Sequence, residues 1–189
     1  MRSSIFLSYP KPWSAEQEAF IEGVTHYLKS RGFEPRTLGV TDYDMDAPLN
    51  GVRRLMLEAN GLVTIAFRRL HVASGAIRRR PATRARASEA PPPLEDETFD
   101  DRWLSTPWPH IEAAMAFQLG LPILVFREAG VVADGVLEPG VVGLYLPEVD
   151  LTQNLESYLQ SPEWTEPLGQ WEGRVRRVIE HKGTPPRLY

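Results

Sequence analysis

Cysteine is absent from this chain of 189 residues, and its absence removes several kinds of chemistry at once. Without thiols the protein forms no disulfide, no thiolate metal site and no cysteine nucleophile. This fits a cytoplasmic protein. Hydrophobic residues make up 42% of the chain, which is enough to bury a core, and the length favours a single domain over residues 1–189.

Long apolar runs and excess positive charge are missing as well. No apolar segment reaches the ~18 residues of a membrane span, and the apolar run in "MRSSIFLSYPKPW" is too short for a signal peptide. The net charge of -4 does not favour binding to nucleic-acid phosphates. We therefore expect a soluble, cytoplasmic protein with no membrane and no DNA partner.

Familiar metal and nucleotide motifs are also absent. The sequence contains no GxGxxG, no P-loop and no Gly-x-Ser-x-Gly elbow. Asp42, Asp44 and Asp46 alternate as in a calcium loop, but the required glycine is missing and an arginine takes the last position, which favours an Asp-rich turn. His110 and Glu112 resemble the H-x-E of zinc deaminases, but the cysteine ligands are lacking. We expect no metal.

What the chain does contain is an alternation of strand and helix patterns. Such an alternation predicts an α/β fold, with a central, mostly parallel sheet covered by helices on both faces. Ligands in these folds bind beyond the carboxyl ends of the strands. The predicted strands are 3–9, 33–38, 61–67, 121–126 and 141–147; the predicted helices follow Ser14 and cover 47–59, 109–119, 151–160 and 163–182.

Residues 68–107 interrupt this alternation. Arginines dominate the first half of the segment, and the second half is rich in proline and then acidic. We expect an irregular Arg/Pro-rich insert, since a loop this long is usually functional or disordered. It is either a mobile, self-neutralising segment or a lid or docking arm whose arginines meet phosphates. The sequence does not separate these alternatives.

Two stretches are candidates for chemistry. In "FLSYPKPW" (6–13), Ser8 and Tyr9 lie at the carboxyl end of a strand, and the helix start near Trp13 and Ser14 offers N–H groups to a phosphate. An ordinary strand-to-helix turn is the alternative. In "TPWPHIEAAMAFQLGLPILVF" (106–126), Pro109 suits a first helical position and places Glu112 in the first turn. A glutamate there gains about 0.3–1 kcal/mol from the helix dipole, which by itself explains the residue.

The order of the two stretches on one α/β frame adds a resemblance. The run "IFLSYPKPWSAEQEAFIEGVTHYLKSRGFEPRT" and the spacing of Thr106, Trp108 and Glu112 resemble Toll/interleukin-1 receptor (TIR) domains, whose Ser-x-Trp-x-x-x-Glu pattern carries the catalytic glutamate. Threonine here replaces the serine. The run "EAAMAFQLGLPILVF" is also similar to nucleoside 2-deoxyribosyltransferases, but their aspartates upstream of the nucleophile have no counterpart. The TIR domain is therefore the favoured resemblance.

Both families have a flavodoxin-like, three-layer αβα layout with a five-stranded sheet, and both cleave an N-glycosidic bond at ribose. The resemblance implies an enzyme that cleaves NAD as its substrate and needs no other cofactor. It further implies a homo-oligomer that serves bacterial antiviral defence, by depleting NAD or by making a nucleotide signal for an effector protein. A noncatalytic scaffold and a nucleobase-exchange enzyme are the alternatives. The implied catalytic residue is Glu112, and the implied substrate-binding residues are Ser8, Tyr9, Trp13, Thr106, Trp108 and His110.

Overall fold

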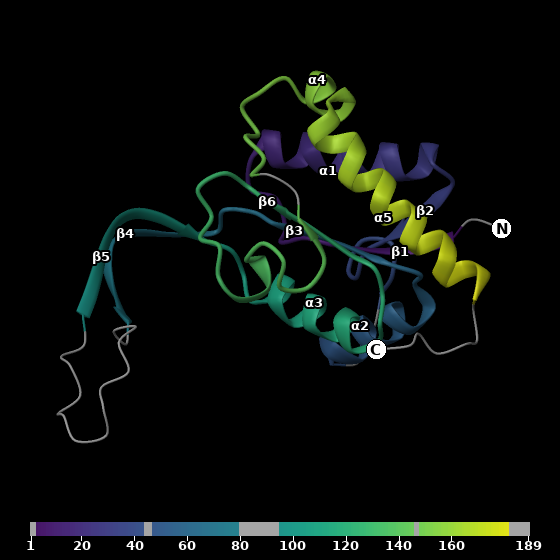
Figure 1. Cartoon of the computed structure of the whole chain (residues 1–189), viewed down its shortest axis with the longest axis horizontal. Helices are drawn as coiled ribbons and strands as arrows, with labels where there is room; N and C mark the ends of the chain where they lie inside the picture. The colour runs from purple at the N-terminus through teal and green to yellow at the C-terminus, as the bar shows by residue number, and fades with distance from the viewer. Residues whose placement is uncertain (1–2, 44–46, 80–94, 146–147, 182–189) are drawn as a thin grey trace.

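Five parallel strands form the central sheet of the protein, in the order β2-β1-β3-β6-β7 (Figure 1). The computed structural model describes residues 3–43, 47–79, 95–145 and 148–181. When the five strands of this sheet are numbered in chain order without β4 and β5, their order is 2-1-3-4-5, as in flavodoxin-like folds. The predicted fold class is therefore confirmed. The strands are β1 (Ser3–Ser8), β2 (Phe33–Arg36), β3 (Leu62–Ala66), β6 (Ile123–Arg127) and β7 (Leu144–Tyr145).

Helices cover both faces of this sheet and complete three layers (Figure 1). On one face the core contains Phe20, Trp164 and Trp171, and on the other face it contains Val52 and Met56. The first face carries α1 (Ala15–Ser30), α4 (Leu155–Gln160) and α5 (Pro162–Glu180); the second carries α2 (Pro48–Glu58) and α3 (Trp108–Gln118).

Element boundaries differ from the predicted ranges where local capping decides them. The helix expected from residue 151 begins only at Leu155, because the side chain of Asn154 accepts a hydrogen bond from the amide of Ser157 and caps the helix there. The strand expected over 141–147 is reduced to Leu144–Tyr145, and residues 146–147 lie outside the described part of the chain. Within the described residues, no helix has the length and apolarity needed to cross a membrane.

The segment 68–107 is not irregular throughout, which corrects the expectation from the sequence. Strand β4 (Leu70–Arg79) pairs antiparallel with β5 (Glu95–Leu104), in a register that runs from Leu70 opposite Leu104 to Arg79 opposite Glu95. The resulting ribbon projects away from the central sheet (Figure 1). Because the ribbon does not lie on the core, its strands lack the apolar alternation that reveals a half-buried strand. Residues 80–94 lie outside the described part.

Candidate functional site

Glu112 lies inside the fold, at the carboxyl edge of the sheet. Helix α3 begins at Trp108, so Pro109 takes its second position rather than the first, and the first turn contains no acidic residue. Glu112 therefore falls beyond the turn in which the helix dipole acts most strongly. Glu112 is only 7% exposed, whereas a glutamate that served only to interact with the helix dipole would be exposed to solvent. The expectation of a first-turn glutamate is thus wrong by one residue, because the helix begins one residue earlier than expected.

A chain of hydrogen bonds from two neighbouring strands holds this carboxyl group. The hydroxyl of Ser8, at the end of β1, donates to Oε2 of Glu112. The hydroxyl of Thr64, in β3, donates to Oγ of Ser8 at 3.3 Å. All three side chains are buried. Ser8, which the resemblance implied to be a substrate-binding residue, is placed where it orients Glu112.

Burial also changes the acidity of the group. It raises the pKa of Glu112 from its ordinary value of 4.5 to about 7, and the hydrogen bond from Ser8 opposes this by favouring the ionised form. At neutral pH the group is thus divided between its acid and its carboxylate forms. A carboxyl group poised in this way is typical of catalytic sites, because it can stabilise a cation or exchange a proton near physiological pH.

Glu112 faces a pocket with a volume of about 240 Å³. Tyr9 and Trp108 supply aromatic surface to this pocket, which we call the Glu112 pocket, and Thr106 lies beside them. Lys11 and Arg69 add two cationic side chains. The remaining lining is formed mainly by apolar side chains, namely Pro10, Leu38, Pro48 and Val52.

Trp13 and His110, two of the residues predicted from the resemblance, do not line the Glu112 pocket. Trp13 stacks on Trp103 at the root of the ribbon, with ring centroids 6.3 Å apart, and its indole N–H donates to the carbonyl oxygen of Arg68 at 2.8 Å. His110 lines a neighbouring hollow of about 360 Å³ together with Asp134. Thr106 borders both hollows.

Sequence reasoning missed Thr64, Lys11 and Arg69. Thr64 is a polar residue inside a buried apolar strand, and that contrast was the available signal. Lys11 lies inside the quoted stretch "FLSYPKPW", and Arg69 lies in the loop after β3, at the edge of the sheet where ligands are expected. Nothing in the sequence shows that these two cations share one pocket.

No group of three or more histidine and acidic side chains with metal-binding geometry occurs among the described residues. Asp42 instead pairs with Arg36, whose hydrogen bond lowers the pKa of the Asp42 carboxyl group. Asp44 and Asp46, the other members of the predicted Asp-rich turn, lie outside the described residues.

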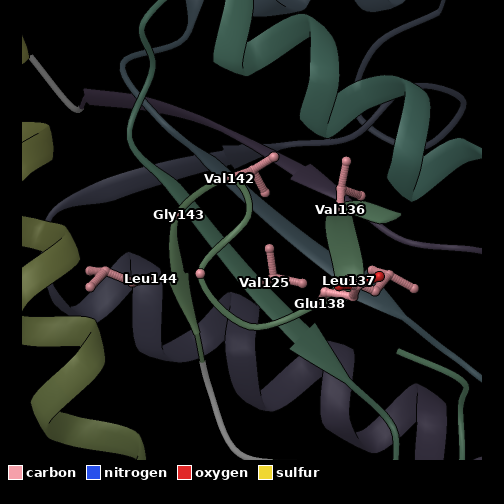
Figure 2. Close-up of a pocket in the computed structure, with 8 residues that line it drawn as sticks. Val125, Val136, Leu137, Glu138, Val142, Gly143 and Leu144 are labelled. Atoms are coloured by element: carbon pink, nitrogen blue, oxygen red, sulfur yellow. The ribbon is translucent and has the colours of Figure 1, made fainter. Parts of the chain in front are cut away.

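A second cavity, between β6, β7 and the loop that joins them, has no comparable chemistry. Figure 2 shows Val125, Val136 and Leu137 around it, with Leu144 on the neighbouring strand. Its volume of about 10 Å³ is at the limit of what one water molecule requires. It is a packing defect of the sheet edge, and the Glu112 pocket remains the candidate site.

Comparisons with known proteins give only remote similarities. No family profile matches the chain, and no curated protein matches it. The CMP N-glycosidase BcmB of Clostridium botulinum shares 14% identity at a TM-score of 0.48, over 82% of this chain and 97% of that chain. The TIR domains of the activated Roq1 resistosome, which recognises the pathogen effector XopQ, share 10% identity at a TM-score of 0.40, over 96% and 86% of the two chains. Both TM-scores are below 0.5, so the chemistry of the site has to be inferred from this chain's own residues.

Proposed function

We propose that the protein cleaves the N-glycosidic bond between nicotinamide and ribose in NAD, with Glu112 as the catalytic residue. The observation that carries the proposal is the state of Glu112: a buried carboxyl group, oriented by Ser8, with a pKa of about 7, facing a pocket with aromatic walls. The spacing of Thr106, Trp108 and Glu112 that resembles TIR domains supports the same reaction.

The reaction requires stabilisation of a cation more than it requires a strong acid. The bond from ribose C1′ to the ring nitrogen breaks with its electron pair going to nitrogen, so the pyridinium leaves as neutral nicotinamide. The sugar develops oxocarbenium character, as in glycoside hydrolysis. The Glu112 carboxylate stabilises that cation electrostatically or by a transient covalent bond, and water or another nucleophile then completes the transfer.

Substrate charge also adjusts the ionisation of the site. A pyridinium or an oxocarbenium ion close to Glu112 favours the carboxylate and lowers its pKa from about 7. Without substrate Glu112 is therefore partly protonated, and the positive charge of the substrate shifts it toward the carboxylate, which is the reactive form. Tyr9 and Trp108 offer flat apolar faces for the nicotinamide ring.

Release of free nicotinamide from NAD tests the proposal. Wild-type protein is expected to release it, and Glu112→Gln is expected to lose at least about a hundredfold in rate, the range typical of a removed electrostatic stabiliser. Glu22→Gln, which changes an exposed glutamate of α1, serves as the matched control and should retain wild-type turnover. Full activity in folded Glu112→Gln refutes the assignment.

The products of the reaction distinguish NAD hydrolysis, ADP-ribose cyclisation and nucleobase exchange. We propose that the released ADP-ribose or a cyclised form of it acts as a signal to an effector protein, or that NAD depletion itself is the output, with the active form a homo-oligomer. Mass spectrometry of the products distinguishes linear from cyclic ADP-ribose. Exchange of nucleobases on deoxynucleosides without loss of NAD would indicate a deoxyribosyltransferase instead, and ligand binding with no bond cleavage would indicate a scaffold.

A further inference from the structure

Two cations, Lys11 and Arg69, line the same pocket as Glu112. They come from the segments after β1 and β3, which are neighbours in the sheet, so the topology brings them to one edge. Both residues are exposed, and Nη1 of Arg69 donates to the main-chain oxygen of Lys11 at 3.3 Å, which links the two segments. Among the described residues, neither side chain forms an ion pair with a carboxylate.

The charges of this pocket are therefore unbalanced. Two cationic side chains line it together with one carboxyl group, and that group is partly protonated at neutral pH because burial raises the pKa of Glu112. Arginine presents several N–H donors that match the oxygens of a phosphate, and lysine adds a mobile charge. The lining thus suits an anionic group bound beside the reacting carbon.

The start of α1, which the sequence suggested as a phosphate site, is less suitable. The side chain of Ser14 already accepts from the amide of Gln17, and the amide of Trp13 donates to Oε1 of Gln17. Glu16 and Glu18 add negative charge in the first turn of the helix. The amides of Trp13 and Gln17 are therefore already occupied, and the nearby carboxylates repel a phosphate.

We propose that Lys11 and Arg69 bind the phosphate adjoining the ribose, so that the site takes nucleotides and discriminates against nucleosides. The inference rests on the proposed function for the position of the scissile bond. The volume of about 240 Å³ is smaller than that of pockets enclosing a whole drug-sized ligand, about 300–1,000 Å³. The inference places the nicotinamide mononucleotide half of NAD in this pocket and the adenosine half outside it.

Nicotinamide mononucleotide and nicotinamide riboside differ by one phosphate and share the scissile bond, so they form a matched pair of probes. Calorimetric titration of Glu112→Gln with each should show the mononucleotide binding at least about tenfold more tightly, the effect of one charge-assisted contact. Adding Arg69→Gln should remove most of that preference, whereas Arg69→Lys, which keeps the charge, should retain part of it. Arg102→Gln, on strand β5 of the ribbon and outside the pocket, is the control and should leave this preference unchanged.

Equal affinity for the two probes, no measurable binding of the mononucleotide, or a preference that survives Arg69→Gln overturns the inference. The outcomes are separable from those of the proposed function, because the titrations measure binding and not bond cleavage. A phosphate preference in a protein that cleaves no NAD refutes the reaction and leaves the phosphate site standing. Cleavage of riboside and mononucleotide at equal rates, with no effect of Arg69→Gln, supports the reaction and refutes the phosphate site.

Discussion

The substitution Glu112→Gln is expected to remove a pH dependence of stability that burial of this carboxyl group creates. Burial raises the pKa of Glu112 in the folded protein to about 7, compared with an ordinary value of 4.5. The folded state therefore holds a proton over an interval in which the unfolded chain has released it. Glutamine has nearly the same shape and no titratable proton, so the variant lacks this linkage.

The sign and the size follow from the two pKa values. The contribution of protonated Glu112 to stability is fully present below pH 4.5 and is lost as the pH rises through about 7. At about 1.4 kcal/mol per pKa unit, the whole interval corresponds to about 3 kcal/mol. Between about pH 5 and about pH 8, the free energy of unfolding of the wild type should fall by about 2 to 3 kcal/mol relative to the variant.

Urea unfolding of both proteins at several pH values measures this difference. Trp164 and Trp171 are fully buried, so their fluorescence reports the loss of the core. Every other titrating group contributes nearly equally to both proteins, and their effects cancel in the difference. Glu22→Gln should keep the wild-type pH dependence. Stabilities of wild type and Glu112→Gln that run parallel across the pH range would refute the buried, proton-holding state of Glu112.

Three further outcomes follow from other contacts. Ser8→Ala removes a hydrogen bond that favours the carboxylate, so the pKa of Glu112 should rise and the acid limb of the rate profile for NAD cleavage should move to higher pH; an unmoved limb contradicts this. Gly61→Ala should destabilise the fold by about 1–3 kcal/mol in urea unfolding, because a Cβ there would lie 2.8 Å from Val175. Gly169→Ala is the matched control on α5, where a Cβ would meet no other atom, and it should stabilise the fold by about 0.5–1 kcal/mol. Trp103→Ala removes the stacking on Trp13 and should make the ribbon more sensitive to limited proteolysis, whereas unchanged proteolysis of the ribbon contradicts this role of the stacking.

The parallel sheet could be predicted from sequence because its strands are buried on both faces. Strands β3 and β6 are continuous apolar runs, and both lie within one or two residues of their predicted bounds. The ribbon of β4 and β5 was missed because its described side chains lie largely in water, so no apolar alternation marks its strands. Its register depends on backbone contacts that no local pattern reveals.

The sequence indicated individual residues of the candidate site but not how they are arranged in space. The motif spacing singled out Glu112, but its burial depends on where α3 begins, which moved the residue out of the first turn. The role of Ser8 as a partner of Glu112 spans 104 positions and becomes visible only in three dimensions. Trp13 was expected near the substrate for its aromatic ring, yet the ribbon supplies Trp103 as a partner for that ring.

The backbone amides of the ribbon and those of the central sheet should exchange their hydrogens with water at very different rates. Both strands of the ribbon are edge strands, because the ribbon has only two. In the described part of the ribbon beyond its root, the amides that face the partner strand are hydrogen-bonded across the ribbon, and every second amide points outward. Strands β1, β3 and β6 have a neighbour on each side. In deuterated water the outward amides of the ribbon should exchange at nearly the rate of a free peptide, while the inner strands exchange only on global unfolding. Arg69, at the junction, lies where the fast part of the chain meets the slow one.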